Sequence, residues 1–265
     1  MLGSFSVEAA RALPGPEWLV QRRVEAASRL PDVVWPTADE EIWRYSRIGE
    51  LDLARFRPLS AEQLGEPGVE GAPGGGPIAA EAGERAGLVV VRNGRVVHHA
   101  LDDTLAAQGV QVCGLATCDL ERVAVTLGAC SDASPDAFTV LHDAFLAGGA
   151  FVKVPKGVVV DRPIVVLHWS EGDGFASFPH TLVVAEEGAE VTVFDRYGST
   201  DTGPGTTGHL VDAVVELLVA DRAHVRYLSV QDHGPRTWQI ALQRAHVGRD
   251  ASLKSSVVAL GGDYA

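Results

Sequence analysis

The most constraining feature of this sequence is that helical periodicity stops at Phe151 and short β-forming runs follow to the end. Runs such as "FVKV", "IVVL", "EVTVF" and "HVRYLSV" are separated by Gly, Asp, Pro or charged pairs. Pro155 and Pro163 stand close together in "GGAFVKVPKGVVVDRPIVVLHW". Because proline removes a ladder hydrogen bond and fixes φ, both residues cannot lie inside a regular central strand. They therefore indicate the corners of a sheet that turns repeatedly.

A loose internal repeat follows these corners. Its copies are Gly188-Ala189-Glu190-Val191, Arg222-Ala223-His224-Val225 and Asp250-Ala251-Ser252-Leu253. Each copy joins a turn residue, a small alanine, a polar residue and a strand former. Short strands with small residues at the corners are typical of a β-solenoid, in which each rung stacks on the last. A sandwich of hairpins would fit the strand lengths too, but its two-residue turn signals are missing here.

The first part of the chain has a different pattern. Residues 16–30, "PEWLVQRRVEAASRL", repeat apolar residues at helical spacing, and Pro16 suits a first helical turn. Thr37 and Glu40 form a capping-box pattern that predicts a second helix or helical turn ending near Gly49. Residues 135–147 predict a further helix, closed by a pair of glycines. The chain is therefore mainly β, with an α+β N-terminal region.

These patterns divide the chain into four parts. Residues 1–64 form an N-terminal helical segment, and residues 65–87 form a Gly/Pro-rich linker whose composition is typical of flexible chain. Residues 88–149 form a small α/β region with a helix and a hairpin, the latter predicted from Asn93-Gly94. Residues 150–265 form the start of the solenoid.

Charge and composition exclude several classes of protein. The formal net charge is −13, and the basic residues are spread along the chain, so nucleic acid and anionic membrane surfaces are poor partners. No stretch is apolar for long enough to span a membrane, and the N-terminus lacks the pattern of a signal peptide. We therefore expect a soluble cytoplasmic protein.

The three cysteines, Cys113, Cys118 and Cys130, are spaced C-x4-C-x11-C. Zinc sites and iron–sulfur clusters usually use a close C-x2-C pair, and clusters usually use four thiolates. The odd count in a chain without a secretion signal indicates reduced, structural thiols. The sequence therefore predicts no metal ligands here.

The histidines offer no clear ligand set. His98 and His99 lie on a predicted strand, so their rings point to opposite faces, and His142 is expected to be an exposed or capping side chain. Six more are spread over the solenoid, where sequence alone does not fix which become rung neighbours. They are His168, His180, His209, His224, His233 and His246.

Catalytic motifs are missing from the sequence. It contains neither a phosphate-binding G-x-x-x-x-G-K-[ST] loop nor a G-x-S-x-G elbow. The adjacent acids Glu186-Glu187 and Asp102-Asp103 are typical of solvated corners rather than of an acid–base pair. We therefore assign no catalytic residue, and we expect that the protein is not an enzyme.

Trp43, Arg44 and Tyr45 form a candidate docking or packing patch. Trp, Tyr and Arg are the usual anchors of protein interfaces. The spacing of Trp43 with Ile42 and Ile48 favours packing of the N-terminal helices onto the rest of the fold.

Three segments together resemble one family. "PTADEEIWRYS", which includes Thr37 and Glu41, resembles the N-terminal segment of SufD, with Ser46 in place of the usual Thr. Residues 138–166 resemble the segment that leads into the β-helix core shared by SufB and SufD, and residues 180–199 resemble the next rung.

The resemblance implies a right-handed parallel β-helix and a non-catalytic scaffold subunit for iron–sulfur cluster assembly in the SUF system. It implies a complex with a SufB-like subunit and a SufC-like ABC-type ATPase. The cluster would be assembled transiently by that complex, and this chain alone would bind no cofactor. Family members continue beyond the equivalent of Ala265, so we expect a solenoid that is incomplete at its C-terminus. Two alternatives stay open, a β-helix carbohydrate-active enzyme and a stand-alone metal-binding β-solenoid.

Overall fold

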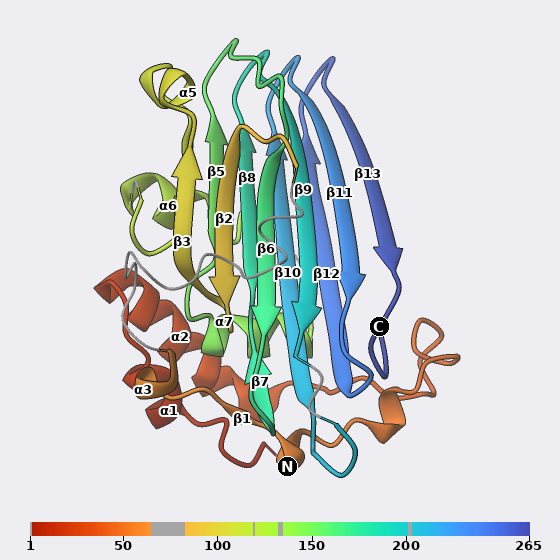
Figure 1. Ribbon diagram of the computed structural model, residues 1–265. Helices are drawn as coiled ribbons and strands as arrows, with labels where there is room; N and C mark the ends of the chain where they lie inside the picture. The colour runs from red at the N-terminus through yellow and green to blue at the C-terminus, as the bar shows by residue number, and fades with distance from the viewer. Residues whose placement is uncertain (1, 65–82, 119, 132–134, 201–202) are drawn as a thin grey trace.

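Two β-sheets stacked face to face form the body of the molecule (Figure 1). The structure is a computed structural model that describes residues 2–64, 83–118, 120–131, 135–200 and 203–265. The helix-covered sheet has the order β1-β7-β10-β8-β5-β4, with β12 beside β10, and the second sheet has the order β13-β11-β9-β6-β2-β3. The strands of the helix-covered sheet are β1 (Arg57–Pro58), β4 (Gln111–Gly114), β5 (Ala150–Val154), β7 (Phe175–Ser177), β8 (His180–Ala185), β10 (His209–Val219) and β12 (Thr237–Val247). Those of the second sheet are β2 (Gly87–Arg92), β3 (Arg95–Leu101), β6 (Ile164–Ser170), β9 (Glu190–Ser199), β11 (His224–Asp232) and β13 (Ser252–Ala259).

From β8 to β13 the chain alternates between the two sheets and winds as a β-solenoid of about 3 turns. Successive rungs pair in parallel, β8 with β10 and β10 with β12 in one sheet, and β9 with β11 and β11 with β13 in the other. The predicted solenoid is confirmed. Parallel pairing without hairpins explains why two-residue turn signals are missing from this half of the sequence.

The internal repeat in the sequence is the corner between the sheets. Gly188, Arg222 and Asp250 all adopt positive φ, at 68°, 60° and 57°. Corners stack by backbone hydrogen bonds, such as the one that the Arg222 amide donates to the Arg249 carbonyl at 2.9 Å. The alanine after each turn residue faces the space between the sheets, and Ala223 is fully buried there. A larger side chain at this position would push the rungs apart.

Both prolines of the opening motif lie outside the strands, as predicted. Pro155 directly follows β5, and Pro163 directly precedes β6. The hairpin at Asn93-Gly94 is also confirmed, because these two residues connect β2 to β3 with positive φ at both. That combination is the signature of a type I′ turn. Since β2 also pairs in parallel with β6, the hairpin extends the second sheet of the solenoid.

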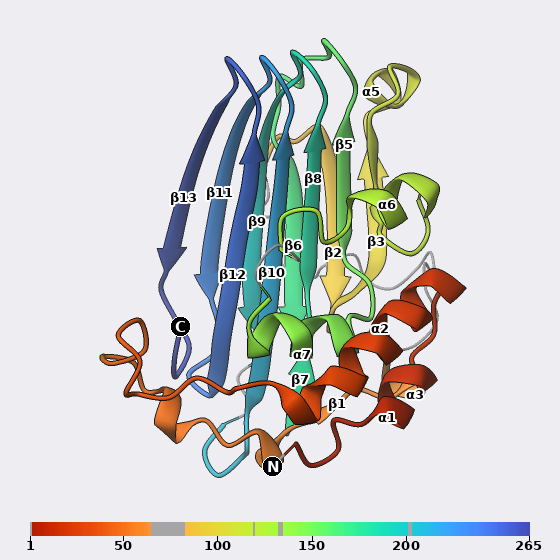
Figure 2. The ribbon, with the colours of Figure 1, turned by 180° about the vertical axis from the view of Figure 1, so that it is seen from behind.

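Helices cover the outer face of the helix-covered sheet (Figure 2). The predicted helix at 16–30 is α2, and the one at 135–147 is α7. Of the helix or helical turn expected to end near Gly49, the helical turn forms: residues 38–46 make turns, and a short 3-10 helix covers Ile48–Glu50. The Thr37 amide still bonds the Glu40 carboxylate at 3.0 Å, so the capping contact forms without an α-helix. The helices are α1 (Val7–Ala12), α2 (Glu17–Arg29), α3 (Ala61–Leu64), α5 (Asp103–Ala107), α6 (Leu120–Thr126) and α7 (Ala137–Phe145), with 3-10 turns at Leu30–Asp32, Ile48–Glu50 and Leu53–Arg55.

Two large clusters make up most of the apolar core. Valine-rich residues of both sheets, such as Val166, Val183 and Val193, fill the space next to the corners. The second cluster, which includes Phe145 and Leu210, joins the N-terminal segment and α7 to the outer face of the sheet. Because helices bury that outer face as well, β8 and β10 are buried on both sides, and this explains their nearly continuous apolar sequences.

The four predicted domain boundaries stay a prediction. Most of the Gly/Pro-rich linker, residues 65–82, lies outside the described residues, while Gly87 opens β2. Among the helices that the structure describes, none is both long and apolar enough to cross a membrane.

Candidate functional site

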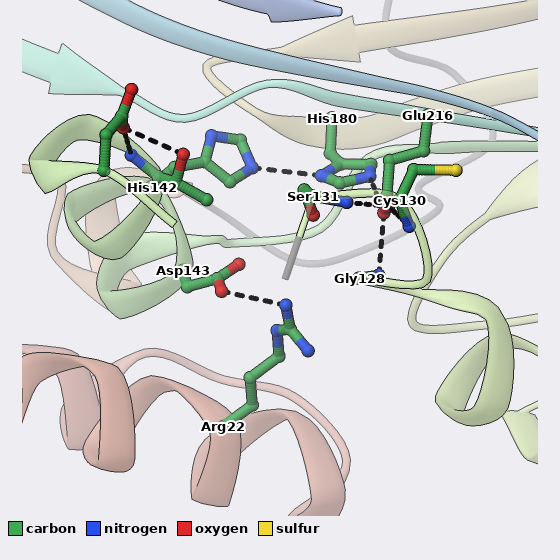
Figure 3. A network of polar contacts seen from close by, with 10 residues as sticks. Arg22, Gly128, Cys130, Ser131, His142, Asp143, His180 and Glu216 are labelled. Atoms are coloured by element: carbon green, nitrogen blue, oxygen red, sulfur yellow. Dashed lines mark hydrogen bonds and ion pairs between the residues drawn. The ribbon is translucent and has the colours of Figure 1, made fainter. Parts of the chain in front are cut away.

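A chain of buried polar side chains crosses from α7 to the helix-covered sheet (Figure 3). His142 lies on α7, His180 opens β8, and Glu216 lies in β10. His142 Nε2 lies 3.1 Å from His180 Nδ1, and His180 Nε2 lies 3.3 Å from Glu216 Oε2. All three side chains are at most 1% exposed. The site thus has three titratable side chains in a buried environment, where an unpaired charge would be strongly destabilising.

The contacts of His142 fix its own hydrogen. Its Nδ1 lies 2.9 Å from the carbonyl oxygen of Asp212, an acceptor, so this nitrogen donates. Burial, followed by the neighbouring His180, holds the pKa of His142 well below its ordinary value, so the ring is neutral and carries one hydrogen. The Nε2 atom of His142 therefore accepts.

This assignment determines the state of His180. Its Nδ1 must donate to the Nε2 atom of His142, while its Nε2 faces the carboxylate of Glu216. A lone pair on Nε2 would face the negative charge directly. Both ring nitrogens of His180 therefore carry hydrogen, and His180 and Glu216 form a buried imidazolium–carboxylate pair.

Glu216 also holds a loop in place. The backbone amides of Gly128, Cys130 and Ser131 donate to its two carboxylate oxygens at 2.7 to 2.9 Å. Burial by itself would raise the pKa of Glu216, but His180 and the amides outweigh it and lower the pKa to about 2. The carboxylate is therefore charged at neutral pH and fixes the loop after α6 against β10.

A salt bridge extends the connection to the N-terminal segment. Arg22 on α2 bonds Asp143 on α7 at 2.8 Å (Figure 3). Together these contacts tie α2, α7, β8, β10 and the loop at 128–131 into one unit. Because the central groups are buried, this network positions structural elements and does not meet a substrate from solvent.

A second polar cluster lies between the sheets. The rings of His168 and Tyr197 stack with centroids 4.4 Å apart, and the hydroxyls of Tyr197 and Tyr227 donate to Asp195 at 3.2 and 2.6 Å. His168 Nε2 lies 3.2 Å from the other oxygen of Asp195. Asp195 is fully buried, and the two tyrosine hydroxyls replace part of the water that its carboxylate loses on folding, while His168 Nε2 hydrogen-bonds Thr181 Oγ1 at 2.9 Å. The solenoid interior is therefore apolar beside the corners and polar farther along the strands.

The six solenoid histidines do not assemble into a metal ladder. His224 and His246 are exposed, whereas the other four are buried. In the part of the chain that the structure describes, no three His, Cys, Asp or Glu side chains are arranged to hold a metal ion. The rung register does bring His180 to His142, a contact that the sequence did not indicate. The expectation of an exposed or capping His142 is wrong, because α7 is buried on nearly all sides.

The expectation of three reduced thiols is wrong for two of them. A disulfide joins Cys113 to Cys118, with their Cα atoms 5.9 Å apart. The turn between them is closed by a hydrogen bond from the Cys118 amide to the Gly114 carbonyl at 3.1 Å. The sequence prediction rested on the odd number of cysteines and the lack of a secretion signal. Neither feature carries information about the local geometry of this turn. Cys130 is free and half-buried, and burial and the charge of Glu216 raise its pKa.

Glu186 and Glu187 lie at a corner, as expected, whereas Asp102 and Asp103 lie at the start of α5. Lys153 lies 3.6 Å from Glu186, and Lys156 lies 2.9 Å from Glu187. Asp102 caps α5 by accepting from the Thr104 amide. These carboxylates therefore contact lysine side chains and backbone amides of neighbouring rungs and turns.

The predicted patch at residues 43–45 is divided by the structure. Trp43 is half-buried against Phe138, with ring centroids 5.9 Å apart. Arg44 is exposed, and Tyr45 is 95% exposed. The role of the whole patch in docking or packing stays a prediction.

The end of the solenoid presents two strand edges. Within the described residues, β13 pairs only with β11, and β12 pairs along its length only with β10. Side chains of this last rung are exposed, among them Val257 at 67% and Val247 at 43%. Unpaired parallel edges beside exposed valines are a surface on which a further strand can pair.

Comparisons with known proteins agree with this architecture. The model of the SufBD protein N-terminal region matches residues 85–166, and the model of the SufBD core domain of SUF system FeS cluster assembly matches residues 168–265. Iron–sulfur cluster assembly SufBD family proteins of Staphylococcus haemolyticus (strain JCSC1435) and Staphylococcus aureus (strain USA300) are each 32% identical over 123 residues. Each match covers 46% of this chain and 26% of the relative's length. With both models matched in order along most of its length, the chain belongs to the SufBD family of iron–sulfur cluster assembly proteins.

Proposed function

We propose that this chain is a SufD-like, non-catalytic scaffold subunit for iron–sulfur cluster assembly in the cytoplasm. It works in a complex with a SufB-like subunit and a SufC-like ABC-type ATPase. The cluster is the product of the complex, and this chain alone holds no cofactor.

The observation that carries the proposal is the match of both SufBD family models, in order, to residues 85–166 and 168–265 of a chain that winds as a β-solenoid of about 3 turns. The buried His180–Glu216 pair supports a scaffold role, because it holds β8 and β10 in a fixed arrangement.

The test is co-expression of the full chain with SufB-like and SufC-like proteins of the same source, followed by affinity capture and size-exclusion chromatography. We expect co-elution with the SufB-like subunit.

Absence of a complex with the native chain, under conditions in which the SufB-like and SufC-like proteins bind each other, contradicts the proposal.

A further inference from the structure

A cleft separate from the strand edges lies where the N-terminal segment meets two loops of the solenoid. Its volume is about 460 Å³, and its walls come from residues 55–56, the 203–207 loop and the segment from Pro235 into β12. This size is within the range of small-ligand pockets in proteins. None of its residues belongs to the His142–His180–Glu216 network.

The charge of the cleft is opposite to that of the protein. Arg55 and Arg236 both line it, although the chain carries a net charge of −13. Within the described residues the Arg55 side chain has no hydrogen-bond or ion-pair partner, and Arg236 donates to the Thr206 carbonyl at 3.1 Å. Two guanidinium groups with unused donors thus face the same space.

The one carboxylate in the lining is already engaged. Asp263 accepts from Arg47 and from the Trp238 indole, both at 2.9 Å. The hydrogen bond from Arg47 lowers the pKa of Asp263, so it is charged and neutralised locally. The charge of Arg236 also contributes to lowering this pKa, but among the described residues no hydrogen bond or ion pair joins Asp263 to Arg55 or Arg236.

The remaining walls are apolar and rigid. Phe56 is buried, and the Trp238 ring stacks on Tyr264 with centroids 4.7 Å apart. Arg47 lies over the Trp238 ring at 5.3 Å, so the indole is held in one orientation. The adjoining loop is fixed at Gly208, which has a φ of +85°, and an added Cβ there would overlap the Arg236 carbonyl.

We propose that this cleft binds a small organic phosphate. The planar guanidinium groups of Arg55 and Arg236 have the donor geometry that phosphate oxygens accept. A phosphate group alone leaves most of the volume empty, and the aromatic and proline walls suit an apolar, ring-bearing body. The ligand class is therefore a phosphate ester with such a body, as in a mononucleotide.

The test is calorimetric titration of the full chain with three probes: adenosine monophosphate, adenosine and inorganic phosphate. Adenosine monophosphate should bind more tightly than either part alone, because it uses both the arginines and the apolar walls. Arg55→Gln should weaken its binding by about tenfold, as expected for the loss of one charge-assisted hydrogen bond.

Arg236→Gln should weaken binding at least as much. Because Arg236 also bonds the Thr206 carbonyl, its replacement can disturb the loop, whereas Arg55→Gln removes a charge without removing a loop contact. Arg226→Gln is the control, because it removes the same charge from an exposed position on β11. Equal affinity of all three variants for adenosine monophosphate, or no binding of that probe to the native chain, overturns the proposal. Equal binding of inorganic phosphate alone also overturns it, since the apolar walls would then contribute nothing. These outcomes do not depend on complex formation and so leave the proposed scaffold function to its own test.

Discussion

The ion pair between His180 and Glu216 is held in the protein interior by hydrogen bonds to the other polar atoms of both side chains, while His180 Nε2 meets Glu216 at an ion-pair distance of 3.3 Å. Glu216 receives three backbone amides, and His180 donates to a neutral His142 that in turn donates to a carbonyl. A buried charge that keeps its partners costs little, whereas one that loses its partner is strongly destabilising. The network is therefore sensitive to any single deletion.

Glu216→Gln tests this sensitivity. The variant removes the negative charge beside the His180 imidazolium and leaves that ring buried without its counter-ion. We expect the free energy of unfolding, measured by urea denaturation at pH 7, to fall by about 3 kcal/mol. Glu190→Gln, at an exposed position on β9, is the matched control and should change it by less than about 0.5 kcal/mol. A loss of similar size in both variants would show that the decrease in unfolding free energy does not come from the buried ion pair.

Because of His233, we expect the free energy of unfolding to fall in acid. Burial, followed by the charge of His209, lowers the pKa of His233 from 6.5 to about 4. Between these values the unfolded chain binds a proton that the folded chain does not. This stabilising contribution is therefore complete above pH 6.5 and is lost as the pH falls toward 4, a total of about 3 kcal/mol. Urea denaturation across this range should show the slope, and His233→Gln should reduce it; an unchanged slope in the variant would contradict the assignment.

At the scale of elements, the corner alanines determine how closely the rungs stack. Ala223 is fully buried between neighbouring corners, while Ala251 holds the same place in the last rung and is half-buried. Ala223→Leu should lower the free energy of unfolding by about 1–3 kcal/mol, because the added methyl groups have no space. Ala251→Leu should cost clearly less. Thermal and urea denaturation of both variants compare the two directly, and equal losses would mean that stacking is not the cause.

Neighbouring elements also differ in how their backbone groups are paired. Strand β11 lies between β9 and β13, whereas β13 pairs on one side only and most of its residues are exposed. Local stability follows such pairing and burial. Hydrogen exchange followed by mass spectrometry should therefore show faster exchange in residues 252–259 than in residues 224–232. Equal protection of the two strands would indicate that another molecule covers the edge.

At the scale of the whole molecule, the buried polar groups, the apolar core and the accessible surfaces lie in different parts of the two sheets. The helix-covered sheet buries the His180–Glu216 pair on its outer side, and the space between the sheets is valine-rich beside the corners and polar near Asp195. The arginine-lined cleft and the exposed side chains of β13 lie outside these buried regions. Buried polar groups thus hold the elements of the fold in place.

The sequence by itself determined the features that depend on neighbouring residues. Pro155, Pro163 and the alanine repeat marked the corners, Asn93-Gly94 marked the hairpin, and apolar spacing marked α2 and α7, because turns and helices follow local backbone preferences. Only the tertiary structure decided which distant residues meet. The contact of His142 with His180, the amides on Glu216 and the cleft between Arg55 and Arg236 all depend on rung register and on the packing of α7. Of the helix or helical turn expected after Thr37, turns and a 3-10 helix form, and the capping contact between Thr37 and Glu40 is made. Local patterns do not encode which rung follows at which offset, since that is set by the side chains that fill the shared core.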